Sequence, residues 1–114
     1  MATDFFPQRP NAHPMIYAYE DTNPQYQGLL KVGYTAIDVD KRVAQQYPTK
    51  RPDGSVSYRI VYRESAMYPD GSSFTDHDVH RVLKRKQIAG MGGEWFRCTV
   101  NDVRAAVRDL SAVS

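Results

Sequence analysis

The sequence has few cysteines, little net charge and no long apolar run, which are features that mark disulfide-rich, nucleic-acid-binding and membrane proteins. One cysteine among 114 residues cannot form an internal disulfide, and a net charge of +2 does not by itself imply a nucleic-acid partner. No apolar run approaches the roughly 20 residues that cross a bilayer, and the first residues lack the basic and apolar segments of a signal peptide. We therefore expect a cytoplasmic protein with no membrane partner.

Common enzyme motifs are also absent from the sequence. It contains no Gly-rich loop followed by Lys-Ser/Thr, no Gly-x-Ser-x-Gly, no His-Glu-x-x-His and no paired CxxC. Cys98 therefore has no CxxC partner, and we expect it to pack as a small buried residue rather than to act as a catalytic thiol. Any chemistry must come from residues that the fold brings together.

The composition is that of one small globular domain. The chain is 41% hydrophobic and 25% charged, which allows one modest core. Residues 1–13 contain prolines and show no periodicity, so we expect an N-terminal arm there and a single domain over residues 14–114.

Basic residues are distributed unevenly along the chain. Ten of the fifteen lie in two blocks, residues 41–63 and 81–86. Clustered basic residues suit a surface that meets phosphates, although charge alone equally allows two solvated faces. The candidates for nucleic-acid binding are Lys41, Lys50, Arg51, Arg81, Lys84 and Arg85.

Hydrophobic periodicity predicts a small α+β layer fold. Residues 15–19 and 28–34 alternate as an antiparallel hairpin around a loop, and residues 56–63 form a third strand with Tyr58 and Tyr62 on one side. Helices are predicted over residues 35–47, from Thr75 and from Thr99, because each begins with a threonine that has an aspartate three positions later. Residues 94–97 are expected to be a short extended piece.

Alternation in the hairpin also predicts which side chains share a face. If the apolar residues of both strands point to the core, Tyr17 and Lys31 lie together on the opposite face. Gly33 lies close to them, and its missing side chain lets another group approach the backbone.

Polar residues at the boundaries of these elements could together hydrolyse a phosphodiester. Tyr17 and Lys31 come from the hairpin, Arg42 from the first helix, and Asp76 and His80 from the second. Metal-assisted hydrolysis needs a carboxylate for a divalent cation, a base for water and a cation for the developing charge. Each residue also has a purely structural interpretation, as sheet packing, a solvated side chain, a helix pair or a helix-dipole partner. Spacing alone leaves both interpretations open.

The order of these residues resembles that of the GIY-YIG nuclease superfamily. It is similar to the phage and restriction-type branch, which reads Lys-Ile/Val-Gly-x-Thr in place of YIG, and the resemblance covers roughly residues 14–110. The residues that carry it are Met15-Ile16-Tyr17, Lys31-Val32-Gly33-Tyr34-Thr35, Arg42, Asp76, His80 and Glu94-Trp95-Phe96.

The resemblance implies a three-stranded antiparallel sheet flanked by helices and a metal-dependent endonuclease that hydrolyses DNA in one step. It implies one divalent ion, Mg²⁺ or Mn²⁺, at Asp76, and double-stranded DNA as the partner. Tyr17 would orient or deprotonate water, Lys31 stands in the place of a second tyrosine, and Arg42 would bind the scissile phosphate. His80 would support the carboxylate or relay a proton. Apart from the resemblance, a small domain with short loops offers little base readout, so a partner domain, a second copy or a longer natural chain would supply any target choice.

Three positions depart from the family pattern. Met15 replaces the first glycine. Gln46 stands where His or Tyr is frequent, and an amide can hydrogen-bond water or phosphate but cannot accept a proton at neutral pH. Asp76 replaces a longer glutamate and can still bind Mg²⁺. These changes leave an alternative open, a non-catalytic module that retains the fold and binds nucleic acid or a protein partner.

Overall fold

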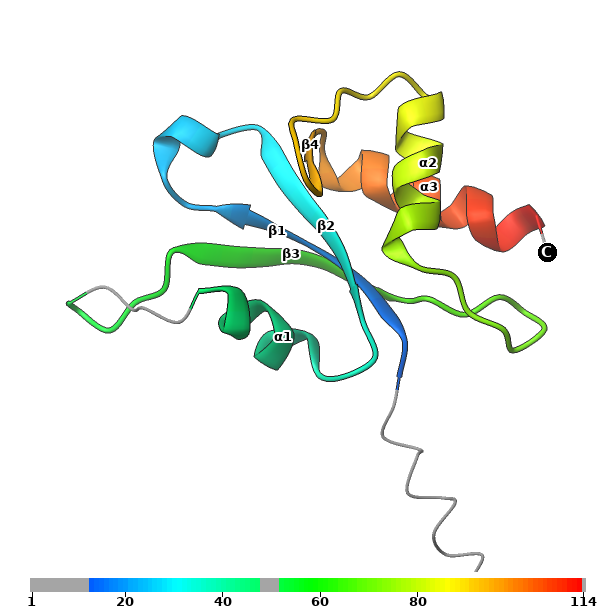
Figure 1. Cartoon of the computed structure of the whole chain (residues 1–114), viewed down its shortest axis with the longest axis horizontal. Coiled ribbons are helices and arrows are strands. Elements are labelled where there is room, and N and C mark those ends of the chain that lie inside the picture. Colours follow the sequence, from blue (N-terminus) through cyan, green and yellow to red (C-terminus); the bar gives the residue numbers. More distant parts are fainter. Residues whose placement is uncertain (1–12, 48–51, 114) are drawn as a thin grey trace, which may run out of the picture.

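The computed structural model describes residues 13–47 and 52–113 and confirms the α+β class (Figure 1). Most of the expected N-terminal arm, together with Lys50 and Arg51, lies outside these residues. None of the helices in the described part of the chain combines the length and apolar character that a membrane span requires. The elements are β1 (Met15–Asp21), the 3-10 turn η2 (Pro24–Tyr26), β2 (Leu29–Thr35), α1 (Val39–Gln46), β3 (Tyr58–Ser65), α2 (Asp76–Arg85), β4 (Trp95–Arg97) and α3 (Val100–Val113).

The sheet has four antiparallel strands in the order β3-β1-β2-β4, so the prediction of three strands was wrong by one. The additional strand is β4, which pairs with the first part of β2 from Leu29 opposite Arg97 to Lys31 opposite Trp95. The sequence did indicate an extended piece here. Three residues are too few for alternation to reveal a pairing partner, which the packing of the chain around β2 decides.

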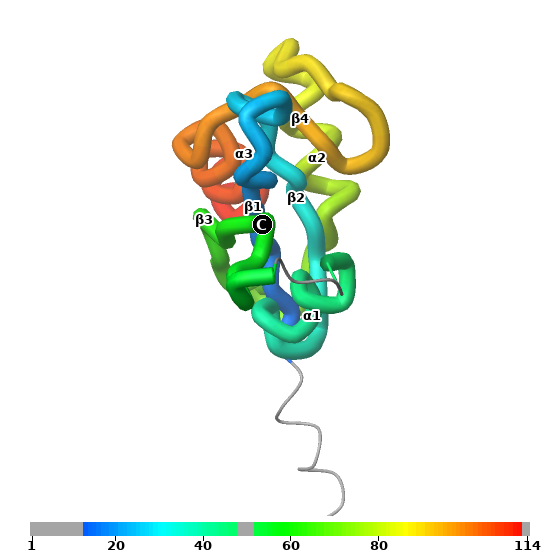
Figure 2. Tube along the Cα trace, turned by 90° about the vertical axis from the view of Figure 1, so that its left-hand side faces the viewer, coloured from blue at the N-terminus to red at the C-terminus, as the bar shows by residue number. Residues whose placement is uncertain are grey.

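Helices cover both faces of the sheet. Ile16 and Val32 belong to the larger core cluster, which packs β1 and β2 against α2 and α3. Tyr17 and Tyr19 point to the other face, where they pack with Val43 and its neighbours in α1. Figures 1 and 2 show α1 on the side of the sheet opposite α2 and α3. The predicted division of faces in the hairpin is confirmed, and the face that carries Tyr17 is itself buried.

Two of the three predicted helix starts are confirmed. The Asp78 carboxylate accepts a hydrogen bond from the Thr75 backbone N–H at 2.9 Å, which closes the predicted capping box of α2. Asp102 accepts from the Thr99 backbone N–H at 2.9 Å before α3. Reciprocal bonds of this kind satisfy backbone donors that a helix start leaves unpaired.

The first helix begins later than predicted. Thr35 still belongs to β2, and its hydroxyl accepts from the Ile37 N–H at 3.0 Å in a local turn. Asp38 caps α1 instead, because its carboxylate accepts from the Lys41 N–H at 3.2 Å. Asp38, which was expected in the first turn, is therefore the N-cap. The sequence offers two suitable cap residues, Thr35 and Asp38, and only one of them can begin the helix.

A bulge changes the faces of β3. Pairing with β1 skips Val61, because Ala18 pairs with Tyr62 while the following residue pairs with Ile60. An inserted residue reverses the alternation beyond it. Tyr58 therefore packs on the α1 side and Tyr62 on the α2 and α3 side, so the prediction that they share a side was wrong.

Cys98 packs as the sequence predicts. Its side chain is buried in the larger core cluster. Burial, followed by the charge of Asp102, raises the pKa of the thiol to about 11. Because the thiolate is the reactive form, this environment suits a packing role.

Candidate active site

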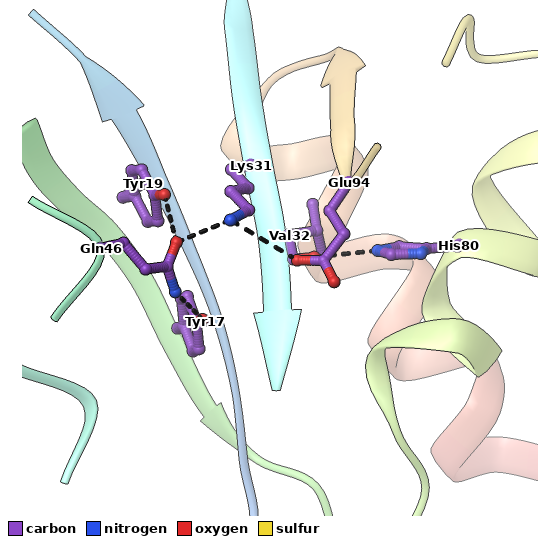
Figure 3. A network of polar contacts seen from close by, with 7 residues as sticks. All are labelled: Tyr17, Tyr19, Lys31, Val32, Gln46, His80 and Glu94. Carbon is purple, nitrogen blue, oxygen red and sulfur yellow. Dashed lines mark hydrogen bonds and ion pairs between the residues drawn. The ribbon is translucent and has the colours of Figure 1, made fainter. Parts of the chain in front are cut away.

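A polar network on the α1 face of the sheet centres on Gln46, the last residue of α1 (Figure 3). Its amide oxygen accepts hydrogen bonds from the Tyr19 hydroxyl and the Lys31 ammonium group, each at 2.6 Å. Its amide nitrogen donates to the Tyr17 hydroxyl at 3.1 Å. An amide that both accepts and donates can join two phenols and an amine. We call these four residues and Glu94, described below, the Gln46 network.

Gly33 determines where the Tyr17 ring lies. The two residues are partners across the β1–β2 pair, and a Cβ at position 33 would lie 2.5 Å from both Cζ and the hydroxyl oxygen of Tyr17. The ring therefore lies directly on the glycine backbone, with its side chain 1% exposed. The close approach predicted at Gly33 is made by Tyr17 itself, and it brings the hydroxyl to Gln46.

Lys31 extends the network from β2 to Glu94, which lies next to the start of the neighbouring strand β4. The Lys31 Nζ lies 3.9 Å from Glu94 Oε1, and the two side chains are 22% and 39% exposed. Glu94 directly precedes β4, and its carbonyl accepts from the Val32 N–H at 3.0 Å. The backbone pairing of β4 with β2 thus holds the carboxylate beside the lysine, as Figure 3 shows.

A second carboxylate, that of Asp76, influences Glu94. Burial raises the pKa of Glu94, and the negative charge of Asp76 raises it further, whereas Lys31 acts in the opposite direction. Asp76 is the first residue of α2 and is buried. Two carboxylates that share a partly buried space favour either a proton or a cation between them.

The donor set of this pair suits a hard divalent cation. Mg²⁺ is commonly held by one or two carboxylates, with water and substrate phosphate completing its coordination. The described residues contain no group of three or more His, Cys, Asp and Glu side chains that could enclose an ion. Asp76 and Glu94 could therefore hold an ion that shares its other positions with water and phosphate.

His80 fixes the start of α2 against β2. Its Nε2 lies 2.9 Å from the Val32 carbonyl oxygen, and because a carbonyl only accepts, the hydrogen is on Nε2. This carbonyl lies beyond the part of β2 that β4 covers. The buried imidazole supplies the missing donor and holds Asp76, one turn earlier, beside the strand.

Arg42 is exposed one helical turn before Gln46. Its side chain is exposed on α1, with Nη1 3.5 Å from Gln45 Oε1. Arg42 lies one turn before Gln46 on α1, so its exposed guanidinium group can meet a phosphate that approaches this helix from solvent.

The described basic candidates lie on two faces of the sheet. Lys41 is on α1 and the other three described candidates are on α2, and Figure 2 shows these helices on opposite sides of the sheet. Arg81 is paired with Asp78 of its own helix. A nucleic acid that contacts both helices must therefore reach from one face of the sheet to the other. The exposed members are Lys41 on α1 and Arg81, Lys84 and Arg85 on α2.

A family model, the T5orf172 domain, matches residues 15–111, from the start of β1 into the last turns of α3. The chain belongs to the T5orf172 domain family. No curated protein and no solved structure matches it. The matched part of this T5orf172 domain contains the whole Gln46 network as well as Asp76 and His80.

Sequence reasoning missed two residues of the site in this T5orf172 domain. Tyr19 carried a usable signal, because it lies two positions after Tyr17 in an alternating strand and must share its face. Glu94 stood out only as part of the Glu94-Trp95-Phe96 segment. Its approach to Asp76 depends on the pairing of β4 with β2, which no local pattern reveals.

Proposed function

We propose that this T5orf172 domain is a metal-dependent endonuclease of the GIY-YIG type that hydrolyses DNA phosphodiester bonds. A T5orf172 domain is compatible with a nuclease-like or DNA-binding role. The observation that carries the proposal is the Gln46 network, which connects the Tyr17 hydroxyl and the Lys31 ammonium group to the carboxylates of Glu94 and Asp76. Phosphodiester hydrolysis needs these kinds of group together.

In this proposal Asp76 and Glu94 hold the divalent ion, Mg²⁺ or Mn²⁺. When bound, the ion supplies a Lewis acid for the phosphate and lowers the pKa of bound water. The raised pKa of Glu94 supports this assignment, since the charge of Asp76 contributes to it and a cation would relieve that repulsion. His80 acts as a positioning residue, because its bond to the Val32 carbonyl holds Asp76 in place.

The remaining roles follow from the hydrogen bonds of the network. Tyr17 and Lys31 orient the attacking water, whose proton passes to bulk water, and the Lys31 ammonium group also stabilises the negative charge that develops on the phosphate. Gln46 fixes both groups but does not take the proton, because an amide is not a base at neutral pH. Arg42, exposed on α1, binds the scissile phosphate.

Nicking of supercoiled plasmid by the purified chain with Mg²⁺ or Mn²⁺ tests the proposal. We expect nicking to be lost on chelation and to fall by about 100-fold or more in Tyr17→Phe and Asp76→Asn, and to fall in Arg42→Ala. Circular dichroism and urea unfolding check that each variant is folded. Unchanged cleavage in all three variants would refute the site.

Matched controls separate the site from general effects of the same substitutions. Tyr26→Phe, Asp109→Asn and Arg108→Ala make the same chemical changes at positions outside the Gln46 network, and each should cleave like the wild type. Asp109 pairs with Lys86 at 2.9 Å, so it is also a carboxylate with a basic partner.

The second candidate function is a non-catalytic module that binds nucleic acid. It is favoured by the burial of Tyr17, whose side chain is 1% exposed and whose hydroxyl is already bonded to Gln46. This alternative predicts DNA affinity whose logarithm falls linearly with the logarithm of salt concentration, with no cleavage in either metal. Metal-dependent nicking that disappears in Asp76→Asn would exclude it.

A further inference from the structure

A cavity of about 280 Å³ lies close to the Gln46 network, because two of its lining residues contact the Tyr19 ring. That ring makes edge contacts with Trp95 and Tyr47, at centroid distances of 5.7 and 5.6 Å, while its hydroxyl points to Gln46. The cavity is lined by Asp21, Tyr26, Leu29, Tyr47, Met91 and Trp95.

Three of its six lining residues are aromatic, and they come from three different segments. The Tyr26 and Trp95 rings lie nearly parallel, 23° apart with centroids separated by 6.3 Å. Tyr47 comes from the end of α1 and packs against Tyr58 with a centroid distance of 5.0 Å. The faces of such rings carry partial negative charge and attract cations, most strongly for Trp. Tyr26 is 39% exposed, so the aromatic surface is open to a ligand from outside.

Asp21 supplies the charge among the lining residues. Its Oδ2 accepts from the Tyr47 hydroxyl at 3.1 Å, and its Oδ1 accepts from the Asn23 N–H at 2.8 Å. A carboxylate oxygen can accept more than one hydrogen bond, so both oxygens can still bind a further donor. Burial, and then the negative charge of Asp21, raises the pKa of Tyr47 to about 12. The same electrostatic field repels phosphate and attracts a cation.

We propose that this cavity binds the guanidinium group of an arginine side chain on a partner protein. A guanidinium ion is flat and stacks on aromatic faces, and its fork of N–H donors matches a carboxylate, so it uses both the near-parallel rings and Asp21. An ammonium ion cannot stack in this way. A nucleotide could stack, but its phosphate would meet the negative charge of Asp21. The proposal does not depend on DNA cleavage.

Trp95 reports on this cavity directly, because it is the only tryptophan in the chain. Titration with N-acetyl-arginine amide, against sodium chloride at equal ionic strength, should change Trp95 emission saturably and shift the indole N–H resonance. Asp21→Asn should weaken this binding by at least about tenfold, because it removes the charged partner. Tyr26→Leu should weaken it as well, and since Tyr26 is half-exposed the fold should be retained.

Asp70→Asn is the matched control. Asp70 accepts from the Ser72 N–H at 2.9 Å, the same local bond to the second following residue that Asp21 makes to Asn23. This variant should bind the arginine probe like the wild type. If both aspartate variants weakened binding equally, the effect would be general charge and the site would be wrong.

Further probes distinguish the competing ligands. N-acetyl-lysine amide and tetramethylammonium should bind more weakly than the arginine probe, because neither has a flat donor fork. Equal affinity for tetramethylammonium would overturn the guanidinium assignment. Saturable binding of adenosine or guanosine without binding of the arginine probe would identify a nucleobase site instead. Absence of any saturable change with the arginine probe would refute the proposal, and loss of plasmid nicking would leave it unaffected.

Discussion

The contact between Gly33 and Tyr17 gives a sharp prediction, that Gly33→Ala destabilises the fold although it adds a single methyl group. The new Cβ would lie 2.5 Å from Cζ and the hydroxyl oxygen of Tyr17 and 2.9 Å from Cε1. Non-bonded carbon atoms separate by about 3.5–4.0 Å, so the ring must move by roughly 1 Å. Tyr17 is buried against Val39 and Val43, which leaves the ring little space to move.

The magnitude follows from three contributions. Overpacking a buried position costs about 1–3 kcal/mol, and displacement of the ring weakens the Gln46–Tyr17 hydrogen bond by about 1 kcal/mol. Replacement of glycine also restricts the unfolded chain, which offsets about 0.4–1 kcal/mol. The free energy of unfolding should therefore fall by about 2 kcal/mol. For a domain of this size the melting temperature should fall by roughly 10 °C.

Urea unfolding followed by circular dichroism measures this change, with Gly90→Ala as the control. A Cβ at Gly90 would lie 3.7 Å from Phe96 Cε2, an ordinary contact, so that variant should be as stable as the wild type or up to about 1 kcal/mol more stable. Tyr17→Leu removes the end of the ring that meets the new Cβ and should therefore be less harmful when combined with Gly33→Ala. Additive effects of the two substitutions, or equal effects of the two glycine variants, would refute the reasoning.

Two further predictions concern stability. His80→Phe keeps a ring but leaves the Val32 carbonyl without its donor, so the free energy of unfolding should fall by about 1–3 kcal/mol. The control His77→Phe, on the exposed side of α2, should have little effect. Equal urea midpoints for the two variants would contradict the inferred bond. Burial raises the pKa of Tyr62 and Tyr47 to about 12, above the ordinary tyrosine value of about 10. Between these two pH values the folded state keeps the phenol protons, whereas the unfolded chain loses them. Stability should therefore decrease as the pH rises from about 10 to about 12, and Tyr62→Phe should reduce that decrease in urea unfolding measured across this range. A stability independent of pH in this interval would show that the phenols are not protected.

The local architecture of this domain is predictable from the sequence. Alternation in the hairpin assigns Ile16 and Tyr17 to opposite faces, and the threonine–aspartate pairs locate the starts of α2 and α3. These features depend on side-chain periodicity and on hydrogen bonds within four residues, which a sequence encodes directly. The same periodicity predicts that Tyr17 and Lys31 share a face, and the Gln46 amide joins them.

The rest of the site depends on contacts between segments that are distant in sequence. The pairing of β4 with β2 brings Glu94 to Lys31 and Asp76, and the bulge at Val61 separates Tyr58 from Tyr62. Strand pairing and bulges are set by the best packing of the whole core rather than by local preference, so the order of residues could not reveal them. The sequence by itself determined the order of the main elements, the caps of α2 and α3 and the faces of the hairpin. Tertiary structure decided that the sheet has a fourth strand, that Tyr17 lies on Gly33, and that the exposed Arg42 side chain contacts Gln45.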